Sequence, residues 1–407
     1  MGLTRVILGV LALATLCVPP GRLVVDAMID QIDGEGLINL GNRDRIWTPA
    51  VNVSIPLAQI TASMSNFSFR TFDPEGVLFY GDTNEGEDWF ILSLRNGVPE
   101  MQIGKGDDLV SVAGGRTLNN GIWHRIQVYS EEKTVALRVD GRRELAMGVH
   151  SHDMDFGTDG YMRLALGGIL INPKKILIPF NPLLDACIQG GRWLNVKKSW
   201  DASRRRRKNA AVLPCYPDIK KGSFFPGYGL ALFNSTDLLR VDPEEEKIII
   251  TVNPSSKRMN GTILSMRSFE SHSTILSLAE DIEAGMIVFK VDTDSIPIHL
   301  KFDKDFNSFN VIIQKDSVAF ARKPDSSESE QQLNIEGDYS NILTQWNAGM
   351  LRLAFGGMLA ESELDIDNSG TDYLEGCIDS IYVQRQKIDL DAAFFKDEEV
   401  SSYSCPV

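Results

Sequence analysis

The stretch "FSFRTFDPEGVLFYGDT", residues 67–83, predicts two β-strands joined by a tight turn. In that turn Pro74 fixes one backbone dihedral angle and Gly76 permits the bend. Two carboxylates, Asp73 and Glu75, flank the proline. Such a pair has three interpretations: catalytic groups, metal ligands, or the solvent-facing acids of an ordinary turn. The rest of the chain has to distinguish them.

Other short strands separated by turns follow along the chain. The stretches "IWHRIQVYS" (122–130), "TVALRVDGRREL" (134–145) and "YMRLALGGIL" (161–170) alternate or stay apolar over lengths typical of strands. Asn96-Gly97 and Asp140-Gly141 are typical hairpin turns. The pattern predicts an antiparallel β-sandwich with its core between two sheets.

The sequence also repeats. "MRLALGGILI" (162–171) matches "LRLAFGGMLA" (351–360), and "LLDACIQ" (183–189) matches "YLEGCID" (373–379), each at an offset of about 190 residues. "FRTFDPEGVLFY" has a weaker echo in "MRSFESHSTILSL" (266–278). We therefore predict two modules of one kind, residues 28–217 and 218–407, with the boundary just after Cys215.

The N-terminal segment and the charge indicate the compartment. Residues 1–27 are expected to be a signal peptide, since the apolar run from Val6 to Val18 is shorter than the roughly 20 residues of a membrane span. No later apolar stretch is long enough to span either, so we expect a secreted protein without membrane insertion. The net charge of −14 argues against a nucleic-acid partner.

The cysteines agree with export. Four remain after the leader, an even number that is expected to pair in an oxidising compartment. Equal separations of 28 positions favour two local disulfides, Cys187–Cys215 and Cys377–Cys405. Zinc ligation is the competing interpretation, but no close pair of cysteines or nearby histidine supports it. Four N-x-[ST] triplets are candidate glycosylation sites: Asn52, Asn66, Asn234 and Asn260.

The combination of "R-T-x-D-P-E-G-V-x-F-Y-G-D", "W-H", "V-D-G" and "LGG", closed by a C-terminal disulfide loop, resembles the laminin G-like domain family. The resemblance covers nearly the whole mature chain and is strongest over residues 65–185. It implies an all-β protein of two tandem laminin G-like (concanavalin-like) antiparallel sandwiches. Tandem pairs of this kind include secreted plasma carriers of androgens and estrogens.

A steroid is a rigid apolar plate with a polar group at each end, so its receptor needs an apolar slot with a hydrogen-bonding group at each end. The resemblance places that slot in the first module. Ser65 matches the residue that binds one end of the steroid, Asp88 the carboxylate at the other end, and Phe90 and Met162 the apolar lining. Period-two alternation independently puts Asp88, Phe90, Leu92 and Leu94 on one face of a strand. A carboxylate at the exposed start of that strand is the alternative.

One position at the far end of the slot departs from the family. Lys105 stands where better-known members carry asparagine, and lysine donates hydrogen bonds but cannot accept them. It is expected either to contact the steroid, beside Asp88, or to be a solvated loop residue.

The resemblance also assigns the opening acids. Asp73 and Glu75 match calcium ligands, with the backbone carbonyl of Leu183 as a further ligand, and an ordinary D-P-E-G turn is the alternative. The second module has Glu270-Ser271-His272 at the echoing position, so a single calcium is expected. Zinc is not expected. The family's zinc histidines are replaced by Gly106 and Asp159, and only His150 and His152 lie in that loop.

Two expectations concern assembly and processing. Val112 and Leu145 match the strand positions at which family members form a homodimer. The run Arg204–Arg207 lies between the first two cysteines and is either a processing site or a solvated loop.

Three functions compete: a steroid carrier, an adhesion or receptor-ligand module that binds a protein or glycan around a calcium rim, and a glycosidase. A glycosidase needs two acids across an open cleft, and Asp73 and Glu75 share one turn. We therefore expect no enzyme activity and favour the carrier.

Overall fold

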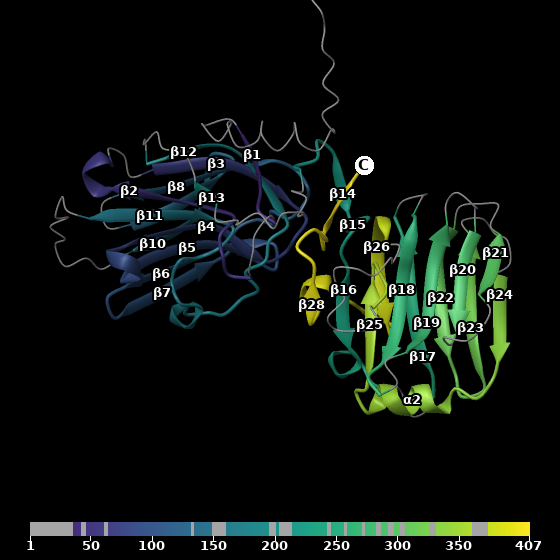
Figure 1. Ribbon diagram of the computed structural model, residues 1–407. Coiled ribbons are helices and arrows are strands. Elements are labelled where there is room, and N and C mark those ends of the chain that lie inside the picture. The colour runs from purple at the N-terminus through teal and green to yellow at the C-terminus, as the bar shows by residue number, and fades with distance from the viewer. Residues whose placement is uncertain are drawn as a thin grey trace, which may run out of the picture.

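The computed structural model describes residues 36–41, 46–60, 64–131, 134–148, 160–194, 201–202, 214–241, 246–255, 259–270, 273–281, 286–291, 297–301, 306–324, 331–359 and 373–407. These residues form two β-sandwiches that follow each other along the chain (Figure 1). The expected signal peptide, His150, His152, Asp159 and Arg204–Arg207 lie outside the described residues. In the described part, no helix has the length and apolar character that crossing a bilayer requires.

The first sandwich, purple to teal in Figure 1, consists of two antiparallel sheets. The order of strands in the first sheet is β1 (Leu37–Asn39), β12 (Ala186–Trp193), β3 (Met64–Thr71), β8 (His124–Glu131), β9 (Thr134–Val139) and β10 (Arg142–Gly148). The order in the second sheet is β13 (Asp201–Ala202), β2 (Val51–Pro56), β11 (Tyr161–Leu166), β4 (Gly76–Thr83), β5 (Asp88–Arg95), β6 (Val98–Lys105) and β7 (Asp108–Ala113).

The second sandwich, green to yellow in Figure 1, has the same construction. Its first sheet runs β15 (Ser223–Pro226), β26 (Glu375–Val383), β17 (Ile248–Pro254), β22 (Phe306–Ile313), β23 (Ser317–Pro324) and β24 (Gln331–Glu336), with β27 (Gln386–Lys387) beside β26. Its second sheet runs β21 (Ile298–Lys301), β20 (Met286–Val291), β19 (Thr274–Asp281), β18 (Gly261–Ser268), β25 (Leu351–Phe355), β16 (Ala231–Asn234) and β28 (Phe395–Lys396).

Short elements complete the described chain. The chain's last strand, β29 (Ser404–Pro406), pairs with β14 (Ile219–Lys221). The remaining elements are helical: η1 (Leu57–Gln59), η2 (Asn84–Gly86), η3 (Pro173–Lys175), η4 (Ser235–Asp237), α2 (Ser340–Asn347) and η5 (Leu390–Ala392).

Strand order shows the sequence repeat directly. The run β2-β11-β4-β5-β6-β7 corresponds to β16-β25-β18-β19-β20-β21, and the other sheets correspond in the same way. The matching "LGG" and "FGG" motifs follow β11 and β25, and Gly167 and Gly356 turn the chain with φ of 73° and 90°. The weaker sequence match at residues 266–278 was wrong, because it does not join equivalent strands. That segment spans β18 and β19, whereas the first-module stretch spans β3 and β4. The counterparts of β3 and β4 are β17 and β18.

Both predicted hairpin turns are confirmed. Asn96 and Gly97 connect β5 to β6 with φ of 51° and 79°, and Asp140 and Gly141 connect β9 to β10 with φ of 49° and 82°. Positive φ at both central residues matches the right-handed twist of the flanking strands, and Asn-Gly and Asp-Gly adopt it at low cost.

Strand β5 is apolar on both faces because two cores meet on it. Leu92 and Leu94 belong to the core between the sheets, with Phe90 packed against it. Trp89 and Ile91 face an outer apolar layer. The predicted alternation that groups Phe90 with Leu92 and Leu94 is therefore confirmed, and it places the Asp88 end of β5 beside the inter-sheet core.

Candidate functional site

Ser65, like Arg70 and Tyr129 of the first sandwich, has a buried polar side-chain atom without a partner among the described residues. It lies on β3 between Trp193 of β12 and Val128 of β8, and it is 2% exposed. In the described part of the chain its hydroxyl has no hydrogen-bond partner. A buried hydroxyl without a partner costs about 1–3 kcal/mol. This atom is therefore suited to bind a polar group that enters the core.

Aromatic rings link Ser65 to the opposite sheet. Trp193 stacks on Phe67, with ring centroids 5.4 Å apart, and lies 5.7 Å from Phe79. Phe79 in turn lies 6.2 Å from Phe90. Trp193 was not among the predicted lining residues. The signal in the sequence was the apolar alternation of "ACIQGGRW", which Trp193 ends. The register shift in β12 between Gln189 and Arg192, where two glycines lie, interrupts that alternation and hides the face that Trp193 occupies.

The predicted far-end residues lie opposite each other. Asp88 of β5 pairs with Lys105 of β6, and the adjacent pair on the same face is Phe90 with Ile103. Met162 of β11 packs against the same core. The Gly106 amide donates to Asp88 Oδ1 at 3.3 Å. The structure thus places an acceptor-only and a donor-only side chain side by side at one end of β5 and β6.

The turn before Asp88 is held from the outside. Lys175 Nζ donates to the Gly86 carbonyl at 3.0 Å, and a Cβ on Gly86 would lie 2.3 Å from the Ile171 side chain. The segment that carries Lys175 therefore fixes the approach of the chain to Asp88.

The acids of the opening stretch organise their own turn. Asp73 is 1% exposed, and its carboxylate accepts from the amides of Glu75 at 3.0 Å and Asp185 at 2.9 Å. Glu75 Oε1 accepts from the Asn181 amide at 2.7 Å. Both acids thus hold the segment that carries Leu183. Neither is a freely solvated turn residue.

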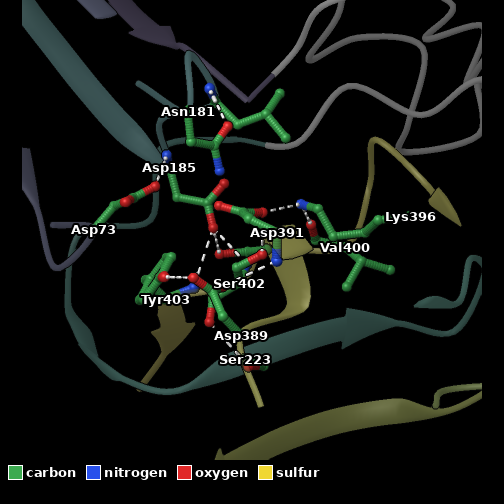
Figure 2. Close-up of polar contacts among 12 residues, drawn as sticks. Asp73, Asn181, Asp185, Ser223, Asp389, Asp391, Lys396, Val400, Ser402 and Tyr403 are labelled. Atoms are coloured by element: carbon green, nitrogen blue, oxygen red, sulfur yellow. Dashed lines mark hydrogen bonds and ion pairs between the residues drawn. The ribbon is translucent and has the colours of Figure 1, made fainter. Parts of the chain in front are cut away.

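A buried acidic junction lies below this turn (Figure 2). Asp185 Oδ2 accepts from Ser401 Oγ at 2.9 Å, from the Tyr403 amide at 3.1 Å and from the Ser402 amide. The first module therefore binds the C-terminal segment of the second through one carboxylate. Because three donors converge on one oxygen, the contact is directional and specific.

Two further groups shape the charge of this junction. Burial, followed by the nearby Asp391 and Asp185 charges, raises the pKa of Asp73 well above its usual value, and burial also raises the pKa of Asp185. Lys396 forms an ion pair with Asp391 at 3.2 Å. The junction therefore holds several carboxyl groups close together and largely shielded from solvent.

The donor chemistry suits a hard cation such as calcium, which prefers carboxylate and carbonyl oxygens. A Cβ on Gly76 would lie 2.3 Å from the Leu183 carbonyl oxygen, so that oxygen is next to the Asp73–Glu75 turn. Among the residues described, however, no three His, Cys, Asp or Glu side chains form a group that could hold a metal. Backbone oxygens would have to complete any set of ligands.

The second module differs at the equivalent place. The counterpart of the Asp73 turn joins β17 to β18, near residues 255–260, which contain no acid. Glu270 instead follows β18, before β19, and Ser271 and His272 lie outside the described residues, so the predicted equivalence of Glu270 with the Asp73 turn was wrong.

The linker between the modules is attached to the first sandwich. Cys187 and Cys215 form a disulfide, as do Cys377 and Cys405, in the pairing expected from the sequence. Arg70, opposite Cys187 in the sheet, donates to the carbonyls of Tyr216 and Pro217, the latter at 2.7 Å. Disulfide and arginine together fix the chain as it enters β14.

The remaining predicted residues lie on strands. Val112 on β7 and Leu145 on β10 occupy edge strands that contact each other, and both pack against the first core. Of the glycosylation candidates, Asn52 lies within β2 and Asn66 within β3, Asn234 ends β16, and Asn260 directly precedes β18.

Known proteins resemble the chain over most of its length. Residues 69–198 match the laminin G domain. Sex hormone-binding globulin of Oryctolagus cuniculus is 27% identical over 366 residues, which is 88% of this chain and 85% of that protein. The Homo sapiens protein of the same name is 28% identical over 364 residues, 88% of this chain and 84% of that protein. Growth arrest-specific protein 6 of Mus musculus is 26% identical, over 88% of this chain and 54% of that protein.

Solved structures agree on the fold. Domains LG4-5 of the mouse laminin alpha1 chain align over 92% of both chains with a TM-score of 0.58 and 19% identity. The LG1-3 region of the laminin alpha2 chain aligns over 91% of this chain and 65% of that one, with a TM-score of 0.51 and 14% identity.

Proposed function

We propose that this chain, a member of the laminin G-domain family and a relative of sex hormone-binding globulin, carries sex steroids in its first module. Members of this family are binding proteins and not enzymes. The observation that carries the proposal is Ser65, which is 2% exposed beside the apolar core and whose hydroxyl has no partner among the residues described.

The arrangement suits a flat apolar ligand. The rings of Phe67, Phe79, Phe90 and Trp193 offer faces and edges for van der Waals contact with fused rings. Ser65 would hydrogen-bond the oxygen at one end of the steroid. Asp88 would accept from a hydroxyl, and Lys105 would donate to a carbonyl, at the other end.

The test is saturable binding of radiolabelled dihydrotestosterone and estradiol to the purified full chain. Ser65→Ala should lower the affinity about tenfold, because it removes one buried hydrogen bond of about 1.4 kcal/mol. Ser68→Ala is the matched control, since Ser68 lies on the same strand three positions later and outside the core cluster. No steroid binding by the wild-type chain would contradict the proposal and would favour an adhesion or receptor-ligand module.

We also propose one structural calcium ion in the first module, held by Asp73, Glu75 and the Leu183 carbonyl. Bound there, the ion would supply positive charge to the buried carboxyl groups of the junction. Calcium should raise the unfolding temperature of the wild-type chain relative to EDTA, and it should have no effect on Asp73→Asn. Magnesium is the control ion, since it requires a smaller octahedral site. Equal stability with and without calcium would contradict the proposal.

Export and dimerisation complete the proposed function. A plasma carrier has to be secreted, and two disulfides are compatible with an oxidising compartment. The homodimer would form along the edge strands that carry Val112 and Leu145, because an edge strand offers unpaired backbone groups to a second copy. Analytical ultracentrifugation of the secreted chain decides between a monomer and a dimer.

A further inference from the structure

The second sandwich exposes two large aromatic rings at one edge. Phe394 is 61% exposed and Phe395 is 41% exposed. The guanidinium of Arg352 lies 5.7 Å from the Phe394 ring centroid and 4.5 Å from that of Phe269. We call these four residues, Phe394, Phe395, Phe269 and Arg352, the Phe394 patch. Exposed rings grouped around an arginine are unusual on a soluble surface unless something covers them.

Asn234 lies next to this patch. It is the last residue of β16, and it pairs with Arg352 of β25, so the two side chains share a face of the sheet. Arg352 Nε donates to Asn234 Oδ1 at 3.4 Å. On the other side of β16, Leu232 pairs with Phe395 of β28. Asn234 therefore contacts the Phe394 patch through Arg352.

The sequence around Asn234 is an acceptor for N-linked sugar, Asn234-Ser235-Thr236. Phe233 and Ser235 on either side are each 2% exposed, which fixes the backbone, whereas Asn234 itself is partly exposed. The contact with Arg352 uses the amide oxygen. A sugar attaches to the amide nitrogen of the same side chain.

We propose that Asn234 is N-glycosylated and that the first sugar of its glycan covers the Phe394 patch. The carbon–hydrogen face of an N-acetylglucosamine would pack on the Phe394 ring, and its oxygens would accept from Arg352. The inference rests on the proposed export, because the modification takes place in the secretory pathway.

The covalent step uses a lipid-linked oligosaccharide diphosphate as donor. The amide nitrogen of Asn234 forms a bond to the sugar carbon C1 as the bond from C1 to the diphosphate oxygen breaks. The lipid diphosphate leaves with that electron pair, and a base of the transferase takes the amide proton. No oxidant or reductant is involved.

The other three acceptors differ from Asn234 in their surroundings. Asn52 and Asn66 lie inside strands that have a neighbouring strand on both sides. Asn260 is exposed and its backbone pairs with Glu375. A glycan at Asn260 would extend into solvent, so that site serves as an internal comparison.

The experiment starts with the full chain secreted from cells that make only high-mannose glycans, and mass spectrometry of its glycopeptides. One enzyme, endoglycosidase H, trims each glycan to a single N-acetylglucosamine. Another, peptide N-glycosidase F, removes it entirely and leaves aspartate in place of the asparagine, a change that is the same in the wild-type chain and in the Phe394 variant used below. Complete removal should lower the unfolding temperature by about 3 °C, a typical shift for a contact of this size. Trimming to one sugar should leave it unchanged, because the proposed contact is made by the first sugar.

Two variants assign that shift to the patch. Phe394→Ser should reduce the difference between the two enzyme treatments by the contribution of the Asn234 glycan, because contributions from glycans elsewhere are the same in both chains. Thr236→Ala should remove the glycan at Asn234 and lower the unfolding temperature, whereas Thr236→Ser keeps the acceptor and should behave as wild type.

Each contrary result has a distinct meaning. A secreted chain with glycans at other acceptors and none at Asn234 overturns the inference. So does a modified Asn234 whose stabilising effect persists in Phe394→Ser, which would leave the patch as a protein-docking surface. A chain that is not exported at all contradicts the proposed export instead.

Discussion

Among single residues, the pair Asp88 and Lys105 would determine which polar group the far end of the proposed steroid slot accepts. The two side chains are direct neighbours across β5 and β6 on the face that carries Phe90 and Ile103. A carboxylate only accepts hydrogen bonds and an ammonium only donates them. A ligand hydroxyl therefore suits Asp88, and a ligand ketone suits Lys105.

Testosterone and androstenedione separate these roles, since they differ only in a hydroxyl or a ketone at that end. Lys105→Met should weaken androstenedione binding by about tenfold, the value of a hydrogen bond to a charged group. It should change testosterone binding by less than about threefold, because Asp88 remains. Competition against a labelled steroid measures both, and Lys105→Arg is the control that keeps a donor. Equal losses for the two steroids would contradict this assignment.

Among the structural elements, the D-P-E-G turn between β3 and β4 packs closely against the segment that carries Leu183. Gly76 has φ of 148°, and a Cβ there would lie 2.3 Å from the Leu183 carbonyl oxygen. The backbone around Leu183 cannot move away without breaking the hydrogen bonds that the Asn181 and Asp185 amides donate to Glu75 and Asp73. The glycine is therefore required both by its conformation and by close approach.

Gly76→Ala should accordingly destabilise the first module by about 3 kcal/mol or prevent its secretion. Gly148→Ala, at the end of β10, is the matched control because its Cβ would have no atom within 4 Å, and it should be nearly neutral. Chemical denaturation of the two variants gives the comparison. Similar stability of Gly76→Ala and Gly148→Ala would contradict this prediction and show that the turn can rearrange at little cost.

At the scale of the whole molecule, Asp185 joins the two modules. Its carboxylate accepts three donors from residues 401–403, while its own amide donates to Asp73 in the first module. The disulfide between Cys377 and Cys405 attaches that C-terminal segment to β26. The contact therefore connects the turn of one sandwich with the frame of the other.

Asp185→Ala should leave these buried donors without an acceptor, at a cost of about 3 kcal/mol. Calorimetry should then resolve two unfolding transitions where the wild type shows one, and proteases should cut the linker near Pro217 faster. Ser401→Ala removes a single donor and should have about a third of the effect. Unchanged cooperativity in Asp185→Ala would mean that other contacts hold the modules together.

Local features could be predicted from the amino-acid sequence: the hairpins at Asn96-Gly97 and Asp140-Gly141, the alternation on β5, the repeat and both disulfides. Each of these depends on residues close in the chain, or on a motif that occurs twice. Only the folded chain placed Trp193 beside Ser65, left the Ser65 hydroxyl without a partner among the described residues, and brought Asp185 to residues 401–403. The two contacts, Trp193 with Ser65 and Asp185 with residues 401–403, join positions more than 100 residues apart. No local pattern specifies them, because burial and hydrogen bonding depend on which strands the whole fold places side by side.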